Sequence, residues 1–318
     1  MQKALNDVPV LLIFFARPEP FSRTFAAVRA ARPSKLFLYQ DGPRAGRPDD
    51  VANIARCREI AESVDWECEI YRFYQEKNVG CDPSEYIAQK WAFEHVDRCI
   101  VIEDDDVASS SFFPYCAELL ERYKNDERIA MICGLNHLGE HHANGCSYFF
   151  TNTGPIWGWA TWKRVVDTWE PDYAALDDPY VVGLLRKNYE SLELQHHLPT
   201  MFKRKADGRA FYETILGLSR FTQNRLCIVP AVNMIQNVGN IAEATHPTST
   251  PSLWIYHLPL LETVFPLKHP RYVIDDSDYS RRTRFLFAGC PSWPRRCWRA
   301  FKRAVKRQIQ KHYPGWRA

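Results

Sequence analysis

Four consecutive carboxylates, Glu-Asp-Asp-Asp at residues 103–106, are the side chains best placed to do chemistry in this sequence. They follow a short apolar run at 99–102 and precede a Phe-Phe pair at 112–113. A buried strand that ends in acids delivers them to the crevice where open α/β sheets bind ligands. Adjacent carboxylates repel one another unless a cation or water screens them, and Mg²⁺ or Mn²⁺ suits such oxygen-rich sites together with substrate phosphates. A solvated acidic turn is the alternative, which the strand placement disfavours.

Strands and helices alternate through the first half of the chain. Strands are predicted over 8–15, 35–40, 68–73, 99–102 and 129–133, with helices over 19–31, 49–64, 83–95 and 111–124 between them. This alternation predicts an α/β fold, a Rossmann-like and mostly parallel central sheet flanked by helices. Neither G-x-G-x-x-G nor G-x-x-x-x-G-K-[ST] occurs, which disfavours dehydrogenases and P-loop enzymes and leaves phosphates to a metal and to side chains.

Three tryptophans fall within six residues, Trp-Gly-Trp-Ala-Thr-Trp at 157–162. Ring faces beside a carboxylate cleft can stack on sugars, which gives Trp157, Trp159 and Trp162 a role on the acceptor side. The alternative is a helix start that packs these rings on the edge of the sheet, and the sequence leaves both open. The histidines within 136–145 match no strong zinc template, so a solvated loop is expected there.

The totals describe a globular chain. Its 318 residues suit one large α/β domain or two modest ones, and 46% hydrophobic with 14% aromatic residues predicts a sizeable core. The ten cysteines include no C-x-x-C pair and are expected to be reduced thiols. The apolar run at 8–16 is too short to span a bilayer and lacks the features of a signal peptide, so a cytoplasmic location is the default expectation.

The C-terminal segment has the opposite charge to the rest of the chain. Residues 281–318 carry twelve Lys or Arg and no acid, whereas the remaining residues are net acidic. Residues 294–311 predict a basic amphipathic helix with an aromatic face, which favours an anionic membrane surface and no nucleic acid as partner. The alternatives are a nucleic-acid tail and a helix docked on the acidic body. We therefore expect a protein peripheral to the inner face of the cytoplasmic membrane.

Seven motifs, in order, resemble the GT-A fold nucleotide-sugar glycosyltransferases, especially the bacterial haemolytic-protein-like group and more distantly N-acetylglucosaminyltransferase I. They are a strand ending near Arg17, then Tyr-Gln-Asp-Gly-Pro-Arg at 39–44, Asn-Val-Gly-Cys at 78–81, Ile-Glu-Asp-Asp at 102–105 followed by Phe-Phe, Gly-Leu-Asn at 134–136, the tryptophan segment and Ala-Thr-His at 244–246. This resemblance implies a glycosyltransferase domain over 1–250, with a nucleotide-sugar half (1–135) and an acceptor half (136–250). An irregular extension (251–293) and the basic tail (294–318) would follow.

The resemblance also implies roles for single residues on the donor side. They are a metal ligand at Asp105, contacts to the donor's sugar and ribose at Glu103 and Asp104, a contact near the nucleobase at Asp41, a basic residue near the diphosphate at Arg17 and a phosphate-side contact at His246. Asp106 departs from the apolar or cysteine residue usual in the family, which leaves open a metal ligand shifted by one position.

Inverting transfer needs a carboxylate that takes the proton of the acceptor hydroxyl, while a metal stabilises the departing diphosphate. The family supplies an Asp upstream of a Cys-x-x-Pro strand, and the matching residue here is Glu213, with its longer side chain. The resemblance thus implies a metal-dependent (Mn²⁺ or Mg²⁺) inverting hexosyl- or N-acetylhexosaminyltransferase. Its donor would be a UDP-sugar, UDP-N-acetylhexosamine among the candidates, and its acceptor a glycan or glycolipid of bacterial surface polysaccharide synthesis.

Two other functions are weighed. A sugar-nucleotidyltransferase also uses a doubly wound sheet, but nothing between residues 10 and 35 resembles its glycine-rich signature with Arg and Lys. A non-catalytic sugar- or membrane-binding protein is the second alternative, because Glu213 stands where the family has Asp.

Overall fold

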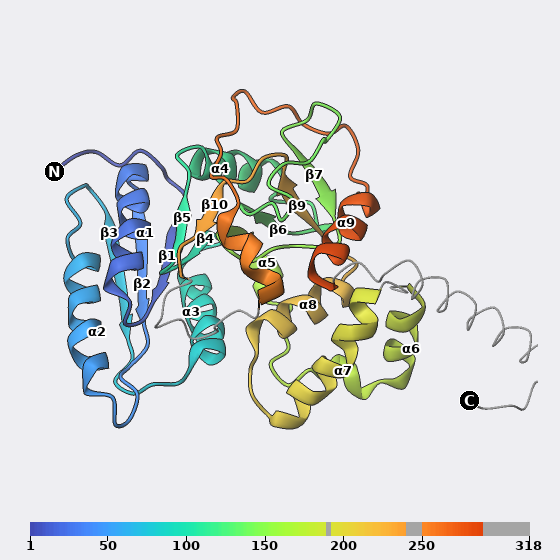
Figure 1. The fold of residues 1–318 in the computed structure, drawn as a ribbon, viewed down its shortest axis with the longest axis horizontal. Helices are drawn as coiled ribbons and strands as arrows, with labels where there is room; N and C mark the ends of the chain where they lie inside the picture. The colour runs from blue at the N-terminus through green and yellow to red at the C-terminus, as the bar shows by residue number, and fades with distance from the viewer. Residues whose placement is uncertain (189–191, 240–249, 289–318) are drawn as a thin grey trace, which may run out of the picture.

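Eight strands form one sheet in the order β3-β2-β1-β4-β8-β6-β9-β7, and two more form a small second sheet (Figure 1). The computed structural model describes residues 1–188, 192–239 and 250–288. The strands are β1 (Val10–Phe14), β2 (Lys35–Gln40), β3 (Glu69–Tyr74), β4 (Arg98–Glu103), β5 (Asp106–Ala108), β6 (Ile129–Cys133), β7 (Tyr148–Thr151), β8 (Trp159–Trp162), β9 (Leu226–Pro230) and β10 (Ile235–Asn237). The predicted α/β class with a mostly parallel central sheet is confirmed.

Helices flank this sheet. They are α1 (Pro18–Ala31), α2 (Pro48–Ala61), α3 (Cys81–His95), α4 (Phe112–Arg122), α5 (Lys163–Val166), α6 (Pro179–Asn188), α7 (Leu192–Asp207), α8 (Tyr212–Thr222) and α9 (Ser277–Ala288), with 3-10 helices η1 (Ala174–Asp177) and η2 (Thr250–His257). Of these, α6, α7 and α8 lie together in the second half of the chain. Within the described ranges, no helix combines the length and apolar character needed to cross a bilayer.

The strand order reverses between β1 and β4. β2 is added on one side of β1, and β3 is added beside β2. The chain then returns through α3, and β4 pairs with the other side of β1. Right-handed crossovers put α1 and α2 on one face of the sheet and α3 on the opposite face. In sheets of this kind the ligand crevice lies at the carboxyl ends of the two strands where the order reverses, here β1 and β4. All five residues of β1 are buried, as expected for a parallel strand covered on both faces.

The small sheet lies beside this reversal point. β5 begins at Asp106, three residues after the end of β4, and pairs antiparallel with β10 so that Asn237 stands opposite Asp106. This pairing brings a segment from the second half of the chain against the acidic turn.

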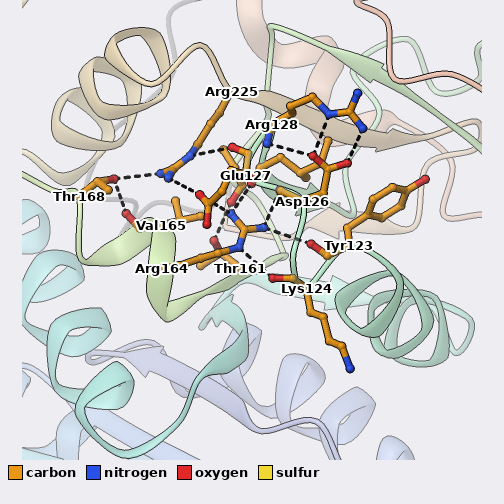
Figure 2. Close-up of polar contacts among 12 residues, drawn as sticks. Tyr123, Lys124, Asp126, Glu127, Arg128, Thr161, Arg164, Val165, Thr168 and Arg225 are labelled. Carbon is orange, nitrogen blue, oxygen red and sulfur yellow. Dashed lines mark hydrogen bonds and ion pairs between the residues drawn. The ribbon is translucent and has the colours of Figure 1, made fainter.

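A network of hydrogen bonds and ion pairs lies at the end of the sheet where β6 and β9 begin (Figure 2). The Arg164 guanidinium donates to the backbone oxygens of Ile129 (3.0 Å), Tyr123 (3.2 Å) and Asp126 (3.0 Å). Arg225 binds the Glu127 carboxylate at 2.8 Å and the Thr168 hydroxyl at 3.0 Å. These bonds tie the turn between α4 and β6 to α5 and to the start of β9, which makes this end of the sheet a structural support.

Two segments differ from the sequence expectation. Trp159 and Trp162 lie on a strand, β8, which runs antiparallel between β4 and β6, and the helix that follows starts only at Lys163. The region expected to be irregular after residue 250 holds η2 and α9, because Tyr279 of α9 is fully buried against Phe149 of β7 at 4.7 Å between ring centroids. The predicted domain limits stay predictions.

Candidate functional site

Arg17 meets the acidic turn at the carboxyl ends of β1 and β4. It lies between β1 and α1, and its guanidinium pairs with Asp104 and, at 2.9 Å, with Asp105. Asp104 also accepts a hydrogen bond of 3.2 Å from the backbone amide of Phe15. Burial alone would lower the pKa of Arg17, but the two carboxylates outweigh burial and raise the pKa. The site therefore contains one fixed cation held by two aspartates.

Asp105 is held from the opposite side by the chain around β10. Its Oδ1 accepts a hydrogen bond of 2.9 Å from Asn237 Nδ2. A Cβ added at Gly239 would lie 1.9 Å from Asp105 Oδ2, so only glycine fits at this position. Burial, followed by the charge of Asp104, raises the pKa of Asp105 to about 6, although Arg17 and Asn237 act to lower it.

Asp106 has a structural role in this arrangement. Its side chain is fully buried, and its oxygens accept hydrogen bonds from the Gly158 amide (2.9 Å) and from Asn237 Nδ2 (3.1 Å). The carboxylate thus joins the small sheet to the loop before β8, which explains why an acid is buried here.

The described residues do not fit the predicted Mn²⁺ or Mg²⁺. Both oxygens of Asp105 are engaged, and a guanidinium 2.9 Å from its carboxylate repels a divalent cation. In the ranges that the structure describes, no group of three or more His, Cys, Asp or Glu side chains is arranged to hold a metal ion. His246, predicted on the phosphate side, lies outside the described residues. No catalytic step is therefore assigned to a metal.

Glu103 is the last residue of β4 and pairs with Ile13 of β1. Besides the acidic turn, carboxyl groups on α3 and α8 act on this region. Burial raises the pKa of Glu103, and the strongest charge acting on it is Glu85 of α3. Glu85 is 5% exposed, and Glu213 on α8 is among the acids that act on it. Since α3 packs on both β4 and α8, the predicted sugar contact and the predicted base come together around a carboxyl group that sequence reasoning missed.

Tyr212 also went unnoticed in the sequence as a member of this group. Its hydroxyl is buried without a hydrogen-bond partner, and Glu103, Glu85 and Glu213 are the charges that act on it most.

The sequence did contain a signal for Glu85, because Glu85 and Gln89 share the buried face of α3 with alanines 88 and 92. Polar residues at helical spacing on an apolar face indicate either a buried network or a ligand site.

Asp41 directly follows β2 and holds the loop before α3. Its two oxygens accept four hydrogen bonds, from the amides of Gly42 (2.8 Å), Val79 (2.9 Å) and Gly80 (3.1 Å) and from Asn78 Nδ2 (2.7 Å). Burial raises the pKa of Asp41, whereas these bonds lower it. The contact near the nucleobase, implied by the resemblance, stays a prediction beside this loop-binding role.

The three tryptophans separate by depth. Trp159 and Trp162 are 1% and 3% exposed, and Trp162 Nε1 donates to the backbone oxygen of Leu120 at 3.0 Å. They are buried as the packing alternative expected, but in a strand inside the sheet and not at a helix start on its edge. Trp157 is partly exposed and packs on Tyr256 at 5.4 Å between ring centroids, and its acceptor contact stays a prediction.

Comparisons with known proteins were made for the whole chain. No protein-family model matches it, and neither does any curated protein. Among solved structures, a UDP-glucose pyrophosphorylase complexed with UDP-glucose is similar at a TM-score of 0.36 and 8% identity, over 71% of this chain and 91% of that chain. A likeness this distant supports no argument, so the function must be argued from the site itself.

Proposed function

We propose that this protein is an inverting glycosyltransferase that moves a sugar from a UDP-sugar to a hydroxyl of a glycan or lipid-linked acceptor. The observation that carries the proposal is that Arg17 and Glu103 lie at the carboxyl ends of β1 and β4, while α3, which packs on β4 and on α8, places Glu85 under the influence of both Glu103 and Glu213. One fixed cation and two separate carboxyl groups at the reversal point of a doubly wound sheet suit an anionic donor and an acceptor that must lose a proton.

Arg17 is proposed to bind the donor diphosphate. A guanidinium has five donors in a fixed fork, and the two aspartates hold it in one orientation at the end of β1. A cation that is already oriented stabilises the negative charge of the departing diphosphate without reorganising during the reaction.

Glu213 is proposed as the general base. It is exposed and stands in the first turn of α8, where the helix dipole favours the ionised carboxylate. The carboxylate takes the proton from the acceptor hydroxyl while the hydroxyl oxygen bonds to the anomeric carbon. The bond from that carbon to the diphosphate breaks at the same time, and the UDP leaves with the electron pair.

The acceptor and location follow from the sequence expectations. Trp157 offers a partly exposed ring for the acceptor sugar. The basic tail at 294–318 would hold the enzyme at the inner face of the cytoplasmic membrane, close to a lipid-linked acceptor of bacterial surface polysaccharide synthesis.

Glu213→Gln tests the base assignment. We expect the variant to lose transfer, or hydrolysis of the donor, by about 10²-fold or more, because it cannot accept the proton. The matched control is Glu94→Gln, an exposed position on α3 that should keep wild-type turnover. The measurement is UDP release from a panel of UDP-sugars, with EDTA and then with Mn²⁺.

Three results would change this conclusion. Full turnover in Glu213→Gln would move the base elsewhere, and a wild-type protein that binds no nucleotide sugar would contradict the proposal as a whole. Release of pyrophosphate from a nucleoside triphosphate and a sugar phosphate would identify a sugar-nucleotidyltransferase. Turnover that EDTA abolishes and Mn²⁺ restores would return Asp105 to the metal role implied by the resemblance.

A further inference from the structure

Two buried polar atoms beside Glu85 have no hydrogen-bond partner. One is the hydroxyl of Tyr212, a residue that is 3% exposed, and the other is Oε1 of Gln89, which is fully buried. An unpaired polar group in the interior costs about 1–3 kcal/mol, so such groups are rare unless a ligand completes them. They are two of the eight such atoms among the described residues, and both lie next to the candidate site, where a ligand atom would complete them.

The same place has an excess of carboxyl groups. Glu85 lies one helical turn before Gln89, whose Nε2 is 3.5 Å from Glu85 Oε2. Asp106, Asp104 and Glu213 are the strongest charges acting on Glu85, all of them acidic. The nearby guanidinium of Arg17 pairs with Asp104 and Asp105. Burial and these acids raise the pKa of Glu85, so the free site disfavours its carboxylate, and a ligand group that brings positive charge and donates hydrogen bonds would favour it.

We propose that Glu85, Gln89 and Tyr212 form, together with Glu103, a subsite for a protonated amino group on the sugar of the donor. This inference rests on the proposed function and names the class of sugar that is transferred. A primary ammonium has three hydrogens to donate and one positive charge. It matches the Tyr212 hydroxyl, Gln89 Oε1 and a Glu85 carboxylate, whereas a hydroxyl or an acetamido group brings no charge.

The exposure of these residues decreases from Arg17 to Glu85, which suggests how the donor would lie: its diphosphate at the surface and its sugar inward. Arg17 is 17% exposed at the end of β1 and receives the diphosphate. Glu103 is partly exposed at the end of β4, whereas Glu85 and Tyr212 lie deeper, between α3 and α8. A sugar ring next to Glu103 thus points its amino group inward, and a polar subsite that is left unpaired by the wrong sugar rejects that sugar strongly.

The test is binding of UDP-sugars to the full chain by isothermal titration calorimetry. The probes are UDP-glucosamine and a UDP-4-amino-4-deoxy sugar, each compared with its N-acetylated and its hydroxyl counterpart, and UDP alone. We expect one amino sugar to bind at least tenfold more tightly than both of its counterparts. Glu85→Gln and Tyr212→Phe should each reduce that preference, with the affinity for UDP unchanged, while Glu94→Gln should keep it.

The outcomes separate this inference from the proposed function. If amino, N-acetylated and hydroxyl forms bind equally, or if the preference persists in both variants, the amine subsite is wrong and the glycosyltransferase proposal stands. If neither UDP nor any UDP-sugar binds, the proposed function itself fails. Glu85→Gln replaces a buried carboxyl group whose pKa is raised by an amide of similar shape, and Tyr212→Phe removes one unpaired hydroxyl, so both should fold, which circular dichroism checks.

Discussion

At the end of β1, a single guanidinium balances two buried carboxylates. The side chains of Arg17, Asp104 and Asp105 are 17%, 5% and 10% exposed, so water screens this group poorly. The Arg29–Asp65 pair offers a contrast, because its side chains are 54% and 41% exposed. Both are arginine–aspartate pairs, and they differ in burial and in the second aspartate that Arg17 binds.

Arg17→Ala is therefore expected to lower the free energy of unfolding by about 3–5 kcal/mol, since it leaves two buried carboxylates without a positive charge beside them. Arg29→Ala should cost at most about 1 kcal/mol. Arg17 lowers the pKa of Asp105, which is about 6 with Arg17 present, so in Arg17→Ala Asp105 becomes neutral at a higher pH and the loss should shrink as the pH falls toward 6. Urea unfolding at several pH values measures both, and equal, small losses in the two variants would contradict the role given to burial.

At the scale of elements, the loop before β8 approaches β10 closely at Gly158, and this loop helps to hold the acidic turn. Gly158 has a φ of +56°, and a Cβ added there would lie 2.3 Å from Ile235 Cδ1 of β10. Its amide holds Asp106, and its carbonyl accepts a hydrogen bond of 2.8 Å from the Gly134 amide. The loop before β8 thus needs glycine both for its backbone conformation and for its close approach to β10.

Gly158→Ala should lower the free energy of unfolding by about 2–4 kcal/mol, combining backbone strain with overpacking against Ile235. Gly46→Ala is the matched control: its φ is +75°, but nothing lies within 4 Å of the added Cβ. It should cost only the strain, about 1 kcal/mol. Thermal or urea unfolding compares the two, and equal losses would mean that contact with β10 is unimportant.

At the scale of the whole molecule, α9 attaches the C-terminal part of the chain to β7. His141 Nε2 lies 2.8 Å from Asp276 Oδ2, and the Tyr279 hydroxyl accepts a hydrogen bond of 3.0 Å from the His137 amide. α9 therefore holds the last described residues of the chain on the side of the sheet that carries β7.

Deletion of residues 294–318 should abolish sedimentation with vesicles that contain anionic phospholipid, because the tail carries nine of the twelve basic residues found after position 280. The melting temperature should not change. Vesicles of phosphatidylcholine alone are the control and should bind neither form. Unchanged binding after the deletion would place the membrane contact on the folded body or exclude it.

The sequence by itself determined the order of strands and helices in the first half, because apolar runs such as that of β1 and the acids that end β4 are local signals. The roles proposed for Arg17, Glu103 and Glu213 came from the family resemblance and stay predictions. Only the tertiary structure decided that β8 is a strand inserted between β4 and β6, and that Arg17 engages Asp105. The meeting of Glu85 with Glu213 likewise depends on α3 packing against α8 across more than a hundred residues of chain. Local periodicity specifies an element and its buried face, whereas long-range packing decides which side chains from distant elements share a site.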